Sequence, residues 1–450
     1  MAVLMWVCLA ARPLHVDELC HAVAVEPGTL DLDINDIPTI QLLLGCCLGL
    51  VVVDEPTSTV RPVHFTVREY LVSQGDLFLN AHSILAEVCL TYLNYRCVNE
   101  LPSNTLTTPA ALPFLKYASC HWGIHAGEQA TPAVKALALG LLSQYPDHIS
   151  ACVYLLEGGD RIGYVANKMV PPPLALITRG FTGLHYAASL GISELVDDLV
   201  RTKPVDIRTK DSFGCTPLLW AVMNGRVKVV KQLLERQDSG ERSVAAWKKR
   251  LPVLSWARMW SGRILDPMWG RNRADPNVKD SRWGRTPLSW AVDRGNKEVV
   301  EVLLNQKDIN PNSRDFTAAT PLSWAAQEGE EEMVRMLLRR EDVNPDEVDS
   351  VGRASLFWAA KSGHVEVVKL LLGQSGINPD KRDTIYGRTA LSQAAEKGNV
   401  GVVKLLLERN DVDPNLADNR GRTPLFWAAR NGHQQIVKLL ERRQPKLRDK

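Results

Sequence analysis

The sequence predicts a mostly α-helical protein in which a solenoid of repeated helix pairs follows two smaller helical domains. The first observation is a phrase that recurs seven times, from GFTGLHYAA at Gly180 to GRTPLFWAA at Gly421. Its leucines lie 34 or 35 residues apart, except for one interval of 70. The second observation is a glycine seven residues after each leucine, in phase from Gly191 to Gly432. A unit of this length cannot bury its apolar face alone, so we expect neighbouring units to stack.

Residues 1–80 have a different pattern, which predicts a winged-helix domain. Apolar residues keep a helical period over 3–10, and Pro13 ends that helix. Further helices are predicted over 17–25 and 40–50, the last of them buried. A hairpin of two strands follows over 51–66, and the next helix begins at Val67. Three helices followed by a hairpin make the winged-helix arrangement.

A winged helix often binds DNA, and the third helix is the one that would enter the groove. Residues 41–50 contain no Lys or Arg and a single amide, Gln41. Contacts to base edges and phosphates need such donors. We therefore expect no nucleic-acid partner, and a helix that faces protein instead.

Residues 81–176 predict a helical linker domain, with helices over 84–95, 111–126, 131–142 and 149–156. The run Pro171-Pro172-Pro173 predicts a stiff joint between this domain and the repeats, which occupy 177–445.

Within each repeat, Thr caps the first helix, Pro takes its first turn and Gly ends it. A second, aliphatic helix follows, as at 299–304, and then a finger segment such as Asp275-Pro276-Asn277 crosses to the next repeat. The interval of 70 residues hides an insertion at about 237–273 that is basic and holds four tryptophans. Three interpretations are open: a functional protrusion on one face, a basic segment that touches membranes, or a retained intron or disordered segment. The last is favoured because removing the insertion restores the period.

The sequence offers little support for catalysis. It has no phosphate-binding loop, no GxSxG and no HExxH. The densest polar cluster is Cys120, His121 and His125, whose spacing suits zinc but is more often found in ordinary core and surface. His64 is expected to be packed or solvated. We expect no enzyme, no metal and no cofactor.

One residue in each repeat stands directly before the small alanine pair, and it is usually aromatic. A stripe of aromatic side chains along the inner helices would supply binding anchors; packing between adjacent repeats is the alternative. The arginine before the capping residue recurs beside this stripe. We assign both sets as candidate partner-binding residues: Tyr186, Trp220, Trp290, Trp324, Trp358, Trp427, Arg285, Arg353, Arg388 and Arg422, with Gln393 in the aromatic position of one repeat.

The composition suggests an intracellular, cytoplasmic protein. The formal net charge is +2, which argues against binding driven by bulk charge. The longest apolar run, 40–53, is too short to span a membrane. Nine cysteines without a CxxC pattern fit a reducing compartment. The last outer helix, around Val437–Leu440, has no clearly polar face, so we expect self-association or fraying there.

The repeats resemble ankyrin repeats over about 177–445. The combination of TPLSWAA with VVKLLLE and DPN fingers resembles fungal NACHT–ankyrin proteins of the STAND class. The segments VCLAARPLHVDELCHAVAV and VHFTVREYL resemble the winged helix that follows the NTPase in those proteins. That segment often carries a label borrowed from GPI inositol-deacylase, which would not imply deacylase activity here.

The resemblance implies two functions. In the family the NTPase switches and oligomerises, the winged helix holds the inactive state, and the repeats sense a ligand. This sequence contains no NTPase. We expect a non-enzymatic recognition or scaffold protein that binds a protein partner on the concave surface of the repeats. The alternative is the sensor half of a NACHT signalling NTPase, in nonself recognition or incompatibility, whose NTPase is missing from this chain.

Overall fold

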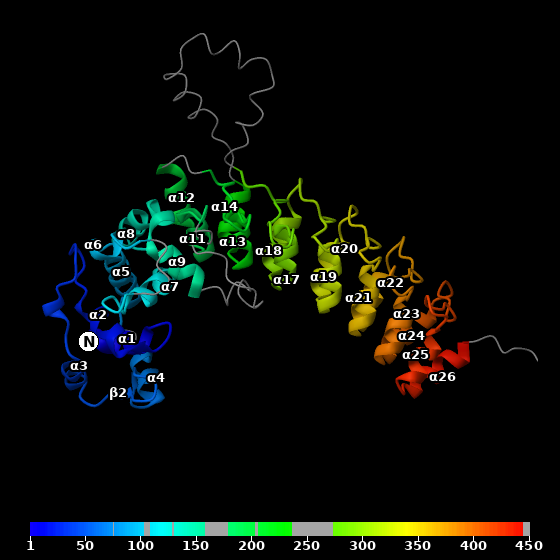
Figure 1. Cartoon of the computed structure of the whole chain (residues 1–450), viewed down its shortest axis with the longest axis horizontal. Helices are drawn as coiled ribbons and strands as arrows, with labels where there is room; N and C mark the ends of the chain where they lie inside the picture. The colour runs from blue at the N-terminus through cyan, green and yellow to red at the C-terminus, as the bar shows by residue number, and fades with distance from the viewer. Residues whose placement is uncertain are drawn as a thin grey trace, which may run out of the picture. The chain divides into compact units, whose positions relative to one another are not determined.

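The computed structural model describes residues 1–74, 76–102, 109–127, 130–157, 179–202, 206–235 and 273–443. It divides into two compact units, residues 1–274 and 275–450. Both are mostly helical, as predicted (Figure 1). The first unit contains the winged helix, the linker domain and two of the seven repeats, and the second contains the other five.

The winged helix contains three strands rather than the predicted two. A strand of only two residues precedes the second helix and pairs with the hairpin, so the antiparallel order is β1-β3-β2. So short a strand leaves no alternating pattern in the sequence. The elements are α1 (Ala2–Leu9), β1 (Leu14–His15), α2 (Val16–Ala24), η1 (Ile34–Asp36), α3 (Ile40–Cys46), β2 (Val51–Asp54), β3 (Thr59–Pro62) and α4 (Phe65–Ser73).

The prediction that the third helix is long and buried is wrong. Helix α3 ends at Cys46, and the chain then turns through positive φ at Leu48 and Gly49. Of its residues only Leu43 is buried, while Leu42 is exposed. A helix of seven residues turns little more than one side chain toward α2, so its other apolar residues lie on the surface of the domain.

The linker domain has its helices close to the predicted places. Helix α5 packs against α7, and Phe114 and Tyr117 fill the space between them and the winged helix. The ring of Trp6 in α1 meets Phe114 edge-on, with 5.4 Å between ring centroids. The elements are α5 (Ala81–Leu93), α6 (Arg96–Asn99), α7 (Leu115–Ala126), α8 (Pro132–Ser143), η2 (Tyr145–Asp147) and α9 (Ile149–Glu157). The predicted proline joint at 171–173 lies outside the described residues.

The first repeat packs directly on the linker domain. Its helices are α11 (Gly183–Leu190) and α12 (Ser193–Thr202), and both contact α8. Gly183 stands where most repeats have proline, and a Cβ there would lie 2.2 Å from the carbonyl oxygen of Leu142. Glycine is therefore required by the close approach of the two backbones. The second repeat is formed by α13 (Pro217–Met223) and α14 (Val227–Glu235).

The second unit stacks five helix pairs in two layers (Figure 1). In each pair the inner helix begins at a capping threonine where one is present: Thr320 Oγ1, for example, accepts the Ser323 N–H over 3.2 Å. The inner helices are α17 (Pro287–Asp293), α19 (Pro321–Glu328), α21 (Ser355–Ser362), α23 (Ala390–Lys397) and α25 (Pro424–Arg430). The outer helices are α18 (Lys297–Leu304), α20 (Glu331–Leu338), α22 (Val365–Leu372), α24 (Val400–Glu408) and α26 (Gln434–Arg443).

The insertion at about 237–273 lies outside the described residues except for Arg273. Its two flanks meet. The Ala274 N–H donates to the carbonyl oxygen of Leu233 over 3.1 Å, and Arg273 Nε donates to that of Leu234 over 2.8 Å. The second repeat is thus closed by contacts between residues about 40 positions apart.

Candidate functional site

Each finger is closed by a buried aspartate. In the fifth repeat, Asp349 Oδ1 accepts the N–H groups of Val351 and Arg353, both over 2.9 Å. The Asp349 N–H donates in turn to the carbonyl oxygen of Arg353 over 3.0 Å. A carboxylate is costly to bury unless such donors surround it. The equivalent residues, also buried, are Asp211, Asp280, Asp315, Asp383 and Asp418.

Five of these six aspartates, all except Asp383, also accept the indole N–H of the tryptophan on the following inner helix. Each bond joins Nε1 to Oδ2 and fixes the ring against its own finger. The pairs are Trp220–Asp211 (2.8 Å), Trp290–Asp280 (3.0 Å), Trp324–Asp315 (3.0 Å), Trp358–Asp349 (3.1 Å) and Trp427–Asp418 (3.2 Å). The polar edge of every tryptophan in the stripe is therefore occupied within the protein.

Burial divides the predicted aromatic anchors into two groups. Tyr186 and Trp220 are fully buried, and the Tyr186 hydroxyl donates to the carbonyl oxygen of Ser119 over 2.9 Å. Trp290 and Trp427, which the sequence analysis assigned as candidate anchors, are buried as well, because only 6% and 5% of their surface is accessible. Packing inside and between repeats accounts for these four side chains.

Trp324 and Trp358 are the two anchors that remain half-exposed. Both keep the bond to the finger aspartate, so each presents part of an aromatic ring in a fixed orientation. They are the members of the stripe that a partner can reach in this structure.

Two of the predicted arginines connect successive repeats. Arg285 lies 4.1 Å from the ring centroid of Trp324 in the next repeat and forms an ion pair with Asp293 over 3.0 Å. Arg388 lies 3.9 Å from the centroid of Trp427 and pairs with Glu396 over 2.7 Å. A guanidinium that stacks on an aromatic ring and also pairs with a carboxylate holds the two repeats together.

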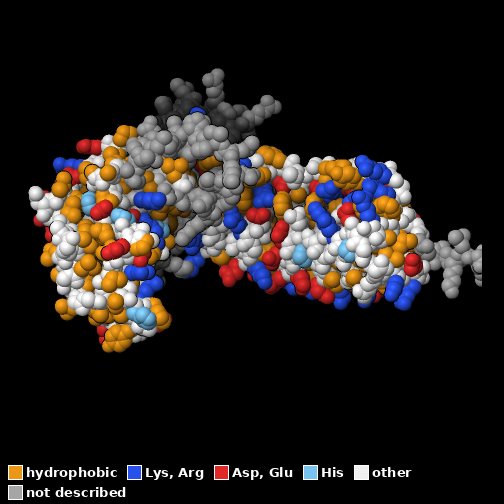
Figure 2. All heavy atoms as spheres, turned by 60° about the horizontal axis from the view of Figure 1, so that its bottom comes forward, with side chains coloured by type: hydrophobic (Ala, Val, Ile, Leu, Met, Phe, Trp, Pro, Cys, Tyr) orange, Lys and Arg blue, Asp and Glu red, His pale blue; other side chains and the backbone are white. Residues whose placement is uncertain are grey.

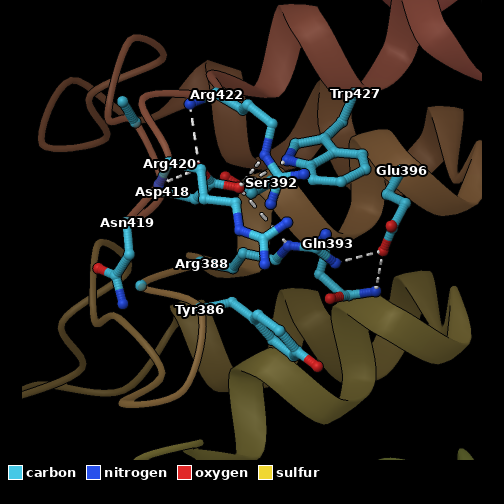
Figure 3. A network of polar contacts seen from close by, with 12 residues as sticks. Tyr386, Arg388, Ser392, Gln393, Glu396, Asp418, Asn419, Arg420, Arg422 and Trp427 are labelled. Atoms are coloured by element: carbon cyan, nitrogen blue, oxygen red, sulfur yellow. Dashed lines mark hydrogen bonds and ion pairs between the residues drawn. The ribbon is translucent and has the colours of Figure 1, made fainter.

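Figure 3 shows how the repeat with glutamine in the aromatic position differs. The Arg388 guanidinium lies between the rings of Tyr386 and Trp427. Gln393 Nε2 donates to Glu396 Oε2 over 2.9 Å, the same oxygen that pairs with Arg388. Gln393 therefore has no indole to bond to the finger aspartate, and its amide instead orients Glu396, the carboxylate that pairs with Arg388.

The surroundings of the last finger aspartate favour its charged form. Burial alone would raise the pKa of Asp418. The N–H groups of Arg422 and Arg420 and the guanidinium of Arg422, which donates to Oδ2 over 2.9 Å, outweigh burial and lower that pKa. This carboxylate is a structural anion and not a proton donor.

The tips of the fingers carry exposed apolar side chains that the sequence analysis missed. They lie in the short segments between the finger aspartate and the following residue of positive φ, which is Gly284, Ala318 or Gly387. Phe316 is 68% exposed, Ile385 50% and Tyr386 46%, and Trp283 is also exposed. Hydrophobic side chains gather with Lys and Arg near the C-terminal end of the repeats (Figure 2). The sequence did contain a signal for them, because turns usually contain polar residues and these turns contain apolar ones.

The fingertips form a continuous hydrogen-bonded row. A backbone N–H of each tip donates to a carbonyl of the preceding tip: Phe316 to Trp283 (2.9 Å), Ser350 to Thr317 (2.8 Å), Thr384 to Val351 (2.9 Å) and Asn419 to Tyr386 (2.8 Å). Phe316 lies over Gly284, where a Cβ would be 2.5 Å from its ring. The exposed side chains are thus mounted on a connected support rather than on separate loops.

The polar residues singled out in the first unit form structural contacts. His64 caps α4, and its Nδ1 lies 2.8 Å from the Thr66 hydroxyl. His125 is buried between Tyr117, 2.8 Å from Nε2, and His82, 3.1 Å from Nδ1. Within the described ranges, no group of three or more His, Cys, Asp or Glu is arranged to hold a metal ion.

Comparison with known families agrees with this architecture. Residues 139–243, 254–349, 310–383 and 356–449 match the family described as ankyrin repeats (3 copies), and the chain belongs to the ankyrin-repeat family. Residues 1–83 match the family described as GPI inositol-deacylase, winged helix domain.

Three curated relatives share parts of the chain. Ankyrin repeat-containing protein C6C3.08 of Schizosaccharomyces pombe is 33% identical over 25% of this chain and 48% of its own length. Ankyrin repeat domain-containing protein SAT10 of Stachybotrys chartarum is 30% identical over 27% of this chain and 6% of its own. Azaphilone pigments biosynthesis cluster protein L of Monascus ruber is 24% identical over 52% of this chain and 54% of its own. The chain thus spans about half or less of each relative.

Among solved structures, the ankyrin repeat domain of Bcl-3 matches with a TM-score of 0.45 and 24% identity, over 58% of this chain and 99% of that domain. None of the helices in the described part of the chain combines the length and apolar character needed to cross a bilayer.

Proposed function

We propose that this chain is a non-enzymatic recognition protein that binds another protein through the fingertips and inner helices of residues 275–443. The observation that carries the proposal is the row of exposed apolar side chains on hydrogen-bonded fingertips, with Trp324 and Trp358 on the inner helices beside it. Exposed aromatic residues on a rigid support are the usual anchors of protein interfaces, because little entropy is lost when they are covered.

The proposed surface differs from the one the sequence predicts. Its anchors are Phe316, Ile385 and Tyr386 together with Trp324 and Trp358. The bridging arginines Arg285 and Arg388 support it from within, since their guanidinium groups are already paired and stacked.

The proposal is tested by affinity capture from the native cell extract with the full chain as bait. Phe316→Lys and Tyr386→Lys should each abolish capture of a protein that the wild type retains. Lys369→Glu, on the exposed side of the outer helix α22, is the control and should capture it normally. Capture that survives both fingertip changes would refute the proposed surface.

A second candidate function is favoured by one observation on the winged helix. Large apolar side chains are exposed on α3, on the turn that follows it and on α4: Leu42, Leu48, Phe65 and Tyr70. Soluble domains rarely leave so many uncovered unless another protein part packs there. We infer that this face receives an NTPase domain of the NACHT type, with the repeats as the sensor of a STAND protein.

Sequencing of full-length transcripts tests this second candidate. A reading frame that continues into a phosphate-binding loop, GxxxxGK[ST], would support it. Transcripts that encode no such loop in frame, with no separate NTPase captured by the full chain, would rule it out.

A further inference from the structure

The fifth repeat lacks an ion pair that the third and sixth repeats have. In two repeats, the arginine before the helix cap forms an ion pair with a carboxylate eight residues later: Arg285 with Asp293 over 3.0 Å, and Arg388 with Glu396 over 2.7 Å. In the fifth repeat the corresponding residues are Arg353 and Lys361. A second cation therefore stands at the carboxylate position. The seventh repeat also has two cations there, Arg422 and Arg430, but its Arg422 pairs with its own finger aspartate, Asp418, over 2.9 Å.

These two cations flank the half-exposed ring of Trp358. The Arg353 guanidinium lies 5.2 Å from the ring centroid and Lys361 Nζ lies 4.7 Å from it. Neither side chain forms an ion pair with any residue that the structure describes. Within the same described part, Nε of Arg353 is buried without a hydrogen-bond acceptor, as are Nε of Arg285 and Nε of Arg388, but those two arginines have a carboxylate at Nη1 and Arg353 has none. A buried guanidinium N–H left without an acceptor is costly.

Two cations and one carboxylate act on the charge of Lys361. Burial, followed by the charges of Arg353 and Lys397, lowers the pKa of Lys361, and Glu396 only partly offsets this. Glu396 is itself held by Arg388 and by Gln393 Nε2. That carboxylate is therefore already used within the sixth repeat.

We propose that Arg353, Lys361 and the exposed face of Trp358 bind a carboxylate side chain of an acidic segment of the partner protein. The inference rests on the proposed function and names the chemistry of its partner. The third and sixth repeats show which group fits, since Asp293 and Glu396 place a carboxylate against the equivalent arginine. In the fifth repeat that carboxylate comes from the partner, and binding it completes the pattern.

Lys361→Glu separates binding from folding. The new carboxylate stands eight residues after Arg353 and rebuilds the ion pair of the neighbouring repeats, so the melting temperature should stay equal or rise. Lys369→Glu is the charge-matched control, because Lys369 is an exposed lysine on the outer helix α22. Both variants change the net charge by the same amount.

The probe is a fluorescein-labelled peptide of about ten glutamates, titrated at low salt with the full chain and followed by anisotropy. Lys361→Glu should weaken binding by about tenfold or more, and Lys369→Glu by less than about twofold. Equal weakening by the two variants, or binding of a polyglutamine peptide as tight as polyglutamate, would overturn the inference. So would a phosphoserine peptide or a single-stranded RNA that binds the site while polyglutamate does not.

A second measurement distinguishes this inference from the proposed function. If the protein captured by the wild-type chain binds the Lys361→Glu variant equally well, the carboxylate site is wrong and the proposed function stands. If Phe316→Lys leaves capture intact while Lys361→Glu abolishes it, the proposed fingertip surface is wrong and the carboxylate site stands.

Discussion

The indole nitrogen of Trp358 donates a hydrogen bond to Oδ2 of Asp349 over 3.1 Å, which ties the inner helix of the fifth repeat to its own finger. The same bond recurs in four other repeats. Because Asp349 also accepts two backbone N–H groups of its turn, one buried carboxylate fixes both the finger and the ring. The stripe of tryptophans is therefore first a structural feature, and only its exposed members are left for recognition.

The first prediction concerns that bond. Trp358→Phe keeps an aromatic ring but removes the indole donor from a buried carboxylate, so it should lower the free energy of unfolding by about 1.5–3 kcal/mol. Trp283→Phe, on an exposed fingertip, is the control and should change it by less than about 0.5 kcal/mol. Urea denaturation measures both. A loss at Trp358 no larger than that at Trp283 would show that the bond does not support the repeat.

The second prediction concerns the insertion. In a regular repeat, five residues lie between a buried leucine near the end of the outer helix and the apolar residue that begins the finger. Leu303 and Ile309 are an example. Deleting 238–272 leaves five residues between Leu233 and Ala274, whose backbones are already hydrogen-bonded. Because loop closure depends only weakly on length, the deletion should leave the melting temperature unchanged or higher. Loss of hydrogen-exchange protection in α13 and α14 would show instead that the insertion is structural.

The third prediction is acid lability of the first unit. His148 Nδ1 accepts the Ser150 N–H over 3.1 Å while Nε2 donates to the carbonyl oxygen of Leu93 over 3.0 Å. His185 Nδ1 accepts the Thr182 N–H over 3.1 Å, and its Nε2 donates to the carbonyl oxygen of Thr209 over 3.1 Å. Both rings are held neutral, and burial, the largest cause, lowers each pKa to about 4.

The sign of the effect follows from proton binding. Between the ordinary histidine pKa of 6.5 and about 4, the unfolded chain binds more protons than the folded one. Stability is therefore full above the upper value and falls as the pH drops, by about 1.4 kcal/mol per pH unit for each histidine. Urea midpoints at about pH 7.5 and pH 5 should show this loss. His185→Gln, which keeps an acceptor and a donor, should reduce it; an identical pH profile for the two proteins would contradict the assignment.

The fourth prediction concerns the end of the stack. In α26, Ile436 and Leu440 are buried against α24, whereas Val437 and Leu439 are half-exposed where a further repeat would pack. The chain should self-associate weakly through this face in sedimentation velocity, and Leu439→Lys should make it monomeric. A wild-type chain that stays monomeric at all concentrations, with α26 as protected from exchange as α22, would contradict this.

The fold was predictable because the residues that determine the helices of each repeat lie within that repeat. The same local signals recur in the same order from repeat to repeat: the cap, the first-turn proline, the terminating glycine and the aliphatic outer helix. These signals specify where the helices begin and end without reference to distant contacts. The site was predictable only in part. The aromatic stripe was found, but the buried Trp290 and Trp427 and the half-exposed Trp324 and Trp358 all make the same bond to the finger aspartate. Their burial therefore depends on packing that no local pattern encodes.

The exposure of the fingertips and of the third helix could not be predicted from the sequence. The exposed apolar residues of the tips, Phe316 and Tyr386, lie in turns, where no helical or strand period marks which side chains are exposed. Helix α3 has an apolar composition that suggests burial, yet Leu42 is on the surface. The composition of a segment shows which of its side chains could be buried, whereas the packing of other elements against it determines which of them are.

Site-specific photo-crosslinking tests the central claim most directly. A benzophenone amino acid replaces Phe316 on a fingertip, Trp358 on an inner helix or Lys369 on an outer helix of the full chain, and the native extract is irradiated. The account predicts one protein crosslinked from Phe316 and from Trp358 and none from Lys369, with that crosslink competed by unlabelled wild-type chain. A partner crosslinked from Lys369 and from neither of the other two positions would contradict the claim that the fingertips and inner helices form the binding surface.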